Sequence, residues 1–357
     1  MKGVVLSGGR GTRLRPITHT GPKQLVPIAN KPVLQYVIED MREAGITEIA
    51  VVLGNTGSDA VQSFLGDGSG FGVEITYVFQ GAPLGLSHAV GCARDFVGGD
   101  NFVVYLGDNI LDQPLSDVVE RFEAGEYAAG LLLREVDNPE QFGVATLDES
   151  GDVVRVVEKP AQPETNLVLT GIFLFSPAVF DAIERVEVSE RGEFEITDAF
   201  QALIDDGRPI ASYRAVGWWK DTGKPGDVLE ANRFVLEDLE TSIDGTVEEG
   251  AEVVGHVDLH ETATIESGAV VRGPVSIAAG TTIGDGTYVG PYTSIGPDSE
   301  VRQAHVENTI LVGESSITAD ETIVDSLVGA GTTVGSAEDL RPKGYRLVIG
   351  ENSDLKL

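Results

Sequence analysis

The chain has 357 residues, more than one hydrophobic core usually supports, so we expect two domains. Hydrophobic residues make up 41% and charged residues 23%, a composition typical of globular rather than disordered chains. The 25 Lys and Arg residues are outnumbered by 57 Asp and Glu residues, which gives a formal net charge of −32. Such a negative surface disfavours binding to nucleic acids and to anionic membranes.

The sequence also favours a soluble, cytoplasmic protein. No apolar run approaches the roughly 18 residues that a membrane-spanning helix needs. The first residues, MKGVVLSGG, are typical of a strand rather than of a secretion signal. Cys92 is the single cysteine, which excludes an intramolecular disulfide and any site with several cysteine ligands.

The acidic excess is accompanied by few lysines, since the chain has 8 Lys and 17 Arg. This combination is typical of proteins from salt-adapted organisms, in which salt screens the self-repulsion of a negative surface. An ordinary acidic protein is the alternative interpretation.

Residues 1 to about 236 alternate strand-like and helix-like segments. Four short runs rich in β-branched residues are predicted to be buried parallel strands: residues 3–6, 48–53, 73–79 and 102–106. A helical stripe of apolar residues runs from Leu34 to Met41, between Pro32 and Gly45. Further helices are expected from about Gly85, near 196–204 and near 228–239. The alternation predicts a Rossmann-like α/β domain with a mostly parallel sheet and helices on both faces.

After about residue 240 the sequence changes to a repeat of six residues. Branched aliphatic residues stand six positions apart at Val247, Val253, Leu259, Ile265, Val271, Ile277, Ile283, Val289, Ile295 and Val301. A hexapeptide period with small corner residues predicts a solenoid and resembles that of left-handed parallel β-helices. The phase slips after Val301, because Glu307 occupies the next inward position, so an inserted loop or an altered corner is expected there.

These patterns predict four segments along the chain. Residues 1–236 form the α/β domain, 237–245 a linker, 246–335 the β-helix and 336–357 a C-terminal tail. The flat sides and the coil end of a β-helix are natural self-association surfaces, so we expect a homo-oligomer. Removal of residues 246–357 is expected to leave a foldable α/β unit.

The first predicted strand runs directly into a glycine-rich segment, SGGRGTRLRP, at residues 7–16. Glycines after a strand let backbone N–H groups approach phosphates closely. The spacing matches neither a Walker A loop nor a dinucleotide fingerprint, so an ordinary turn is the alternative. Arg13, Arg15 and Lys23 add cations to this segment and favour phosphate binding.

GGRGTRLRPIT and PKQLVPIANKPVLQY resemble the N-terminal signature of the sugar-1-phosphate nucleotidylyltransferase family. The resemblance is strongest to its long-form glucose-1-phosphate thymidylyltransferases, which carry a C-terminal left-handed β-helix. Further motifs of that family follow in order: QGAPLGL from Gln80, LGDN from Leu106, FGV from Phe142, EKP from Glu158, TG at Thr170, RGEFEITD from Arg191 and WKDTG from Trp219. The resemblance covers essentially the whole chain.

The resemblance implies nucleotidyl transfer from dTTP to glucose 1-phosphate, which gives dTDP-glucose and pyrophosphate. Mg2+ is the implied cofactor, held by Asp108 and Asp221, and carboxylate oxygens are ligands that Mg2+ prefers. Either aspartate could instead be a helix N-cap or a turn former.

The resemblance also assigns roles to other residues. Arg13 neutralises the departing pyrophosphate, Lys23 the α-phosphate, and Lys159 holds the sugar phosphate. The implied catalytic set is Arg13, Lys23, Asp108, Lys159 and Asp221. The implied nucleotide-binding set is Gly8, Gly9, Gly11, Gln24, Gln80 and Gly85. The implied sugar-phosphate set is Gly143, Glu158, Lys159, Leu169, Thr170, Arg191 and Trp219. A surface ion pair of Glu158 with Lys159, and a core position for Trp219, are the alternatives.

Three alternative functions stay open. UTP could replace dTTP, because thymine and uracil differ by one methyl group. His256, His260 and His305 allow a second, acetyl-transfer activity in the β-helix. A non-catalytic scaffold or sensor is the third. Phe173 and Leu84 depart from the pattern of short-form members, which bears on sugar specificity and allosteric control rather than on the reaction.

We expect both the melting temperature and the turnover to rise as KCl is raised from dilute to molar concentration. The reason is that counterions screen repulsion among the acidic side chains, and between them and anionic substrates. Thermal unfolding and initial rates across a KCl series check this. A melting temperature that falls as KCl rises would contradict salt adaptation.

Overall fold

The computed structural model describes residues 1–335 and 352–354, which form two compact units. The first unit comprises Met1–Arg10 and Val33–Asp221, and the second comprises Gly11–Pro32 and the described residues from Thr222 onward. The segment with the predicted phosphate-binding cations therefore packs in the second unit, although the expected domain boundary is at residue 236. The expected C-terminal tail lies almost entirely outside the described residues.

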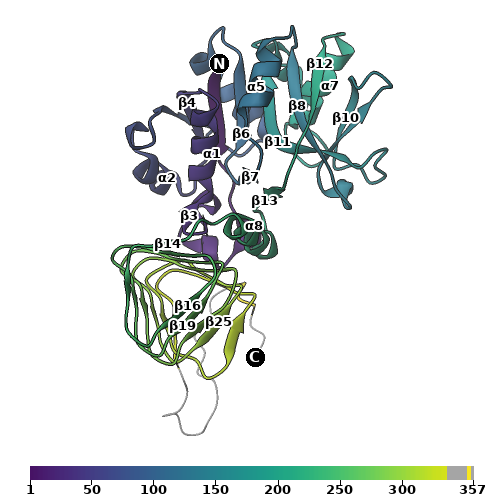
Figure 1. Ribbon diagram of the computed structural model, residues 1–357. Coiled ribbons are helices and arrows are strands. Elements are labelled where there is room, and N and C mark those ends of the chain that lie inside the picture. The colour runs from purple at the N-terminus through teal and green to yellow at the C-terminus, as the bar shows by residue number, and fades with distance from the viewer. Residues whose placement is uncertain (336–351, 355–357) are drawn as a thin grey trace. The chain divides into compact units, whose positions relative to one another are not determined.

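A nine-stranded sheet organises the first unit (Figure 1). Its strands in spatial order are β10 (Val153–Glu158), β9 (Gly143–Leu147), β11 (Leu167–Phe175), β6 (Phe102–Leu106), β1 (Lys2–Ser7), β4 (Glu48–Leu53) and β5 (Glu74–Phe79), and β8 (Ala129–Glu135) pairs with both β11 and β12 (Ile210–Arg214). The strands β6, β1, β4 and β5 run parallel, and β11 joins them antiparallel to β6. The predicted Rossmann-like α/β class is confirmed.

Helices cover both faces of this sheet because successive side chains of a strand point to opposite sides. On one face, Val4 and Val104 belong to a core shared with α3 (Leu86–Cys92), α6 (Val179–Ile183) and α7 (Ile196–Asp205). On the other face lies α1 (Val33–Glu43), whose Met41 sulfur would be 2.7 Å from a Cβ at Gly3. The remaining helical segments are α2 (Ser58–Leu65), α4 (Arg94–Val97), α5 (Ser116–Glu123) and the 3-10 turns Ser69–Phe71 and Pro139–Gln141.

The second unit contains a parallel β-helix, as the hexapeptide period predicts. Its strands form three stacked sheets: β14 (Ser242–Ile243), β17 (Val257–Leu259), β20 (Val275–Ile277), β23 (Thr293–Ile295), β26 (Ile310–Leu311) and β29 (Leu327–Val328); β15 (Thr246–Val247), β18 (Thr264–Ile265), β21 (Thr282–Ile283), β24 (Glu300–Val301), β27 (Ser316–Ile317) and β30 (Thr333–Val334); and β16 (Glu252–Val254), β19 (Val270–Arg272), β22 (Tyr288–Val289), β25 (His305–Glu307) and β28 (Thr322–Val324). The inward aliphatic residues, such as Val271 and Ile295, stack into one core.

The phase slip after Val301 is a shortened corner rather than an inserted loop. Ile283 pairs with Val301, 18 positions later, whereas Val289 pairs with Val306, 17 positions later. Val306 is therefore the buried residue of this coil, and the charged Glu307 stays exposed. One residue fewer at the corner restores the apolar side chain to the core.

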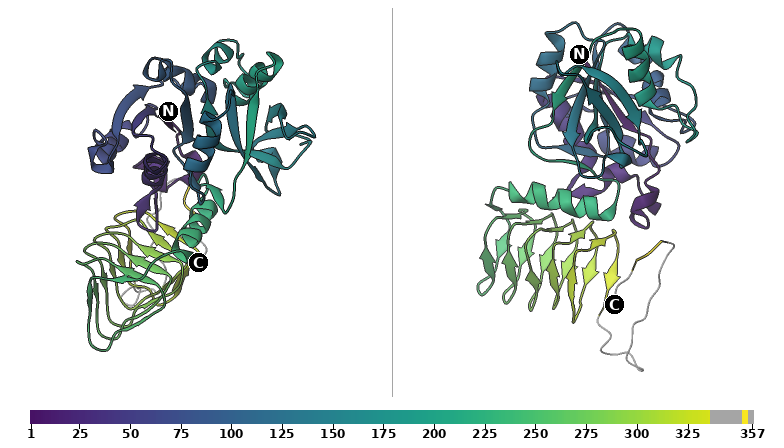
Figure 2. Two further views of the ribbon diagram at one scale, coloured as in Figure 1. Left: turned by 45° about the horizontal axis from the view of Figure 1, so that its top comes forward. Right: turned by 90° about the vertical axis from the view of Figure 1, so that its right-hand side faces the viewer.

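The helix α8 (Pro225–Glu237) lies along the β-helix, as the right-hand view of Figure 2 shows. The segment before residue 33 adds the 3-10 turns Thr12–Leu14, Ile17–His19 and Lys23–Leu25 and a hairpin of β2 (Pro27–Ile28) with β3 (Lys31–Pro32). In the part of the chain that the structure describes, no helix is both long and apolar enough to cross a bilayer.

We expect Ile295→Ala to lower the free energy of unfolding by about 3 kcal/mol, because it leaves a cavity at a fully buried position of the β-helix. Ile243→Ala is the matched control in the same sheet, since Ile243 is 43% exposed, and it should cost less than about 1 kcal/mol. Urea unfolding of both variants measures the difference. Ile243 stands in the same inward column as Ile295 but on the end coil, so equal effects would contradict the difference in burial between the two positions.

Candidate functional site

Two acidic residues predicted to hold a metal lie beside each other in the first unit. Asp108 follows β6 by two positions and is 7% exposed. The next residues form β7 (Asn109–Leu111), which pairs antiparallel with β13 (Trp219–Asp221) so that Asp221 faces Asn109 across the ladder. Opposite residues of an antiparallel pair have Cα atoms about 4.5–5.5 Å apart. Asp221 is therefore a close neighbour of Asp108.

The donor set of this pair fits a divalent ion of the Mg2+ kind. Mg2+ is commonly held by one or two carboxylates, and phosphate oxygens and water supply the rest of its coordination shell. Across residues 1–335 and 352–354, no group of three or more His, Cys, Asp or Glu side chains could hold a metal by itself. A metal at this pair would therefore depend on ligands from a bound phosphate or from water.

Trp219 ties this strand pair to the central sheet. Its indole N–H donates to Oδ1 of Asn109 and to the carbonyl oxygen of Thr170, both at 2.9 Å. The Asn109 amide in turn donates to Oδ1 of Asp108 at 3.3 Å. The ring meets Phe142 edge-on, with centroids 5.6 Å apart. Trp219 thus braces Asp108 through Asn109, in addition to any role as a wall of the predicted sugar pocket.

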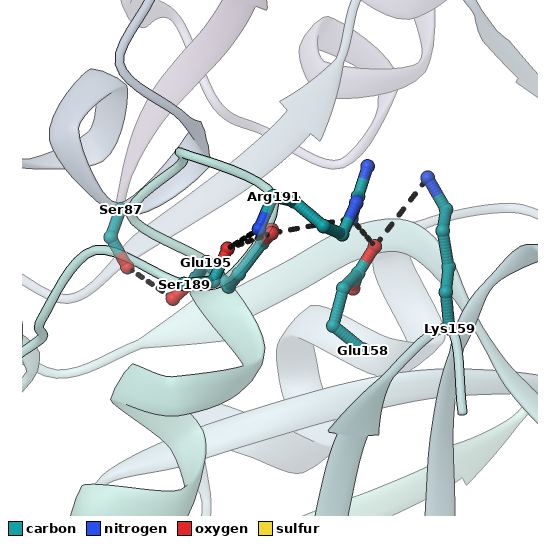
Figure 3. A network of polar contacts seen from close by, with 6 residues as sticks. All are labelled: Ser87, Glu158, Lys159, Ser189, Arg191 and Glu195. Atoms are coloured by element: carbon teal, nitrogen blue, oxygen red, sulfur yellow. Dashed lines mark hydrogen bonds and ion pairs between the residues drawn. The ribbon is translucent and has the colours of Figure 1, made fainter. Parts of the chain in front are cut away.

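A second polar cluster joins two motifs that are separate in sequence, EKP from Glu158 and RGEFEITD from Arg191 (Figure 3). Oε1 of Glu158 lies 3.6 Å from Nζ of Lys159 and 3.0 Å from Nη1 of Arg191. Arg191 also bonds Oε1 of Glu195 at 3.2 Å, and the Ser189 hydroxyl donates to the same oxygen at 3.0 Å. Two cations thus share a single carboxylate oxygen of Glu158.

Glu195 is the buried member of this cluster, with a side chain only 6% exposed. Burial raises the pKa of its carboxyl above the usual value, while the hydrogen bond from Ser189 and the charge of Arg191 act in the opposite direction. Its backbone carbonyl accepts a hydrogen bond from Ser87 at the start of α3, at 2.8 Å. Glu195 therefore connects the cluster to the helix that follows the predicted base-reading segment.

The other predicted sugar-site residues adjoin Glu158. Gly143 pairs with Glu158 across β9 and β10. A Cβ at residue 143 would lie 3.3 Å from Oε2 of Glu158 and 3.4 Å from Cδ2 of Leu169. Gly143, Glu158 and Leu169 of the predicted set are therefore neighbours, and a side chain at position 143 would crowd Oε2 of Glu158.

The predicted base-reading residues also lie together. The Gln80 amide donates to the carbonyl oxygen of Gly85 at 3.0 Å and lies 3.3 Å from Nδ1 of His88. A Cβ at Gly8 would be 3.1 Å from Oε1 of Gln80. Gly85 has φ 114°, and a Cβ there would be 2.5 Å from the carbonyl oxygen of Phe194, so only glycine fits. Gly9, one residue after Gly8, is exposed.

The remaining predicted nucleotide residues belong to the second unit. Gly11 has φ 60°, and a Cβ there would be 3.2 Å from Cβ of Lys23. Arg13 is exposed on the 3-10 turn Thr12–Leu14. Gln24 is 1% exposed, and its Oε1 has no hydrogen-bond partner among the residues that the structure describes. A buried acceptor without a partner carries a desolvation penalty, which a bound ligand would remove.

Three residues that contact the predicted site residues were not themselves predicted from the sequence. Asn109 stands next to Asp108 in the same motif, so an amide beside a metal-binding carboxylate was the available signal. Glu195 lies within the run that begins at Arg191, but an acidic side chain is normally expected to be exposed. His88 is a neighbour of the Gln80 amide, and no signal in the sequence indicated this contact.

The histidines of the β-helix have local contacts. Nδ1 of His256 lies 3.2 Å from the Thr241 hydroxyl, and Nδ1 of His260 lies 3.0 Å from the Thr262 hydroxyl. His305 packs edge-on against Tyr288, with ring centroids 5.7 Å apart. The acetyl-transfer alternative stays a prediction of the sequence.

Comparisons with known proteins agree with this geometry. A family model described as nucleotidyl transferase matches residues 2–238. The low-salt glycan biosynthesis nucleotidyltransferase of Haloferax volcanii is 62% identical over the full length of both chains. A glucose-1-phosphate thymidylyltransferase of Streptomyces griseus is 47% identical over 99% of this chain and 98% of its own.

The fold is also similar to that of a solved structure. It is of a Bacillus anthracis protein described as a glucose-1-phosphate thymidylyltransferase, in complex with sucrose. It superposes with a TM-score of 0.63 at 36% identity and covers 68% of this chain and 98% of its own. Together with the family match over residues 2–238, this shows that the chain belongs to the nucleotidyl transferase family.

Proposed function

We propose that the protein transfers a thymidylyl group from dTTP to glucose 1-phosphate and requires Mg2+. An oxygen of the sugar phosphate attacks the α-phosphorus in line, and the bond to the departing pyrophosphate breaks. Catalysis of this type consists mainly of positioning and charge neutralisation. The sequence similarity to the Streptomyces griseus thymidylyltransferase, which extends over nearly the whole chain, supports the choice of substrates.

The observation that carries the proposal is the proximity of Asp108 and Asp221. These residues come from distant parts of the sequence, and their backbones lie close together at one end of the strand pair β7–β13, where Asp221 pairs with Asn109. Asp108 and Asp221 hold Mg2+, which neutralises charge on the phosphates when it is bound. Asn109 and Trp219 keep the Asp108 carboxylate in place through two successive hydrogen bonds.

Lys159 and Arg191 bind the phosphate of the sugar substrate in this proposal. Both already share Oε1 of Glu158, so they are held close enough for one phosphate to bind both. Oε2 of Glu158 lies beside Gly143 and accepts a hydrogen bond from a sugar hydroxyl. The two oxygens of this carboxylate thus have separate roles: Oε1 positions the two cations, and Oε2 binds the sugar hydroxyl.

The family resemblance assigns nucleotide binding to residues of two segments of the chain. Gln80 and the backbone at Gly85 read the pyrimidine, because an amide can both donate and accept hydrogen bonds. Arg13 and Lys23 neutralise the triphosphate, and Gln24 supplies a buried acceptor. Thymine and uracil differ by one methyl group, so discrimination between dTTP and UTP amounts to about 10- to 200-fold at most.

Pyrophosphate release measured for each pair of a nucleoside triphosphate and a sugar 1-phosphate tests the proposal. We expect the highest kcat/KM for dTTP with glucose 1-phosphate, and a lower value for UTP within the range set by one methyl group. A higher value for UTP would make the enzyme a uridylyltransferase. If no pair released pyrophosphate, a scaffold or sensor role would replace the enzymatic one.

We expect Asp108→Asn to lower kcat by about 10²–10³-fold and to raise the Mg2+ concentration needed for half-maximal rate, because the neutral amide binds Mg2+ less well. Asp112→Asn is the matched control at the other end of β7, where the side chain accepts a hydrogen bond from Trp218 N–H. This control should keep both values close to those of the unchanged protein. Equal activity of the two variants would contradict the assignment of Asp108.

A further inference from the structure

The hairpin that joins β2 to β3 in the second unit has a strained tip. Ala29 has φ 47° and Asn30 has φ 62°, so both central residues adopt the left-handed conformation of a type I′ turn. Glycine or asparagine normally occupies such positions, since a Cβ destabilises this conformation. The alanine therefore needs external contacts to keep the turn in place.

Asn232 of α8 supplies the central contact to this tip. Its Oδ1 accepts the backbone N–H of Ala29 at 2.8 Å and the hydroxyl of Ser294 at 2.7 Å. Its amide nitrogen donates to the carbonyl oxygen of Tyr292 at 2.9 Å. The side chain is fully buried, with both ends bonded. One carboxamide thus connects the hairpin, α8 and the β-helix.

The β-helix contacts the tip directly as well. The amide of Asn30 donates to the Ser276 hydroxyl at 2.9 Å, and that hydroxyl donates to Asp258 at 3.1 Å. Ser276 and Ser294 are neighbours on β20 and β23, and both are buried although they point away from the apolar core. A small polar patch on the outside of the β-helix, defined as Ser276 and Ser294, therefore receives the hairpin.

The hairpin begins directly after the predicted nucleotide-binding turn. Lys23 and Gln24 lie in the 3-10 turn Lys23–Leu25, and the N–H of Val26 bonds back to the carbonyl oxygen of Lys23 at 3.1 Å. The linking residues Val26 and Ile28 are buried. A short, packed segment of this kind transmits a shift of the tip to Lys23 and Gln24.

We infer that Asn232 and the polar patch of the β-helix position Lys23 and Gln24 for the nucleotide. Asn232 is then a positioning residue, and the β-helix supports the nucleotide-binding turn rather than being an independent appendage. The inference rests on the proposed function, because it assumes that this turn binds the triphosphate. It also argues against the expectation that residues 1–245 alone form a complete catalytic unit.

Steady-state kinetics of the full-length chain test this inference. We expect Asn232→Ala to lower kcat/KM for dTTP by about 10- to 100-fold, mainly through KM, and to change KM for glucose 1-phosphate less than about twofold. Ser294→Ala, which removes only the β-helix hydroxyl, should shift KM for dTTP in the same direction by a smaller factor.

Arg233→Ala is the matched control, because Arg233 is the next residue of α8 and its hydrogen bond and ion pair are with another part of the β-helix, while its guanidinium packs over the Tyr292 ring at 5.7 Å. It donates to Asn308 at 2.6 Å and lies 3.6 Å from Asp325. We expect this variant to leave KM for dTTP unchanged. If Arg233→Ala raised KM for dTTP as much as Asn232→Ala does, general loosening of α8 would explain the effect and the inference would fail.

Hydrogen exchange of residues 22–32 provides a second readout, which does not need activity. We expect faster exchange at the Ala29 amide in Ser294→Ala and in Asn232→Ala, with no such change in Arg233→Ala. Should Asn232→Ala not fold, Ser294→Ala alone decides, and unchanged exchange and KM in that variant would refute the inference. If the protein without substitutions showed no activity, the proposed function would be overturned. Hydrogen exchange would still test whether Asn232 and Ser294 hold the hairpin tip in place.

Discussion

The pairing of β7 with β13 is the constraint on which the candidate chemistry depends. It brings a segment after residue 218 against the residues that follow β6, and it places Asp221 opposite Asn109. The register matters because a shift by one residue would turn Asp221 to the other face of the ladder. Trp219 secures this register, since its N–H reaches both Asn109 on β7 and Thr170 on β11.

Each remaining group of the candidate site combines one mobile polar side chain with a rigid neighbour. Gln80 follows the end of β5 and contacts Gly8 and Gly85, and at Gly85 a larger residue would not fit. Arg191 lies on a loop, but it is held between Glu158 on β10 and the buried Glu195. The central sheet therefore supplies fixed points, and the connecting segments supply the groups that meet the ligands.

Local patterns predicted the elements well where one strong physical signal dominates. The strands 48–53 and 102–106 were predicted to the residue, because continuous apolar runs end abruptly at polar or glycine positions. The inward residues of the β-helix up to Val301 followed from their period. The phase slip at Glu307 indicated an inserted loop or an altered corner. It did not indicate which of the two, because a change of phase alone does not distinguish a deletion from an insertion.

The contacts around Asn232 could not be predicted from the sequence. Its partner Ala29 is 203 positions away, and nothing local distinguishes this asparagine from one on an exposed helix face. Likewise, the burial of Glu195 depends on Ser87 and Ser189 and on the packing of α7, not on its own residue type. The proximity of Asp108 and Asp221 could be expected only because family motifs linked two aspartates that lie far apart in the sequence.

The shared oxygen of Glu158 has a consequence for how the protein recognises an anion. Lys159, Arg191, Glu158 and Glu195 together carry as many negative as positive charges, so this cluster projects little field of its own. In the proposed function, a phosphate that binds there replaces an internal anion instead of meeting an empty positive surface. Recognition of this kind is an exchange of ion partners at contact distance. It is therefore less sensitive to ionic strength than attraction over a Debye length, an advantage for a chain with a formal charge of −32.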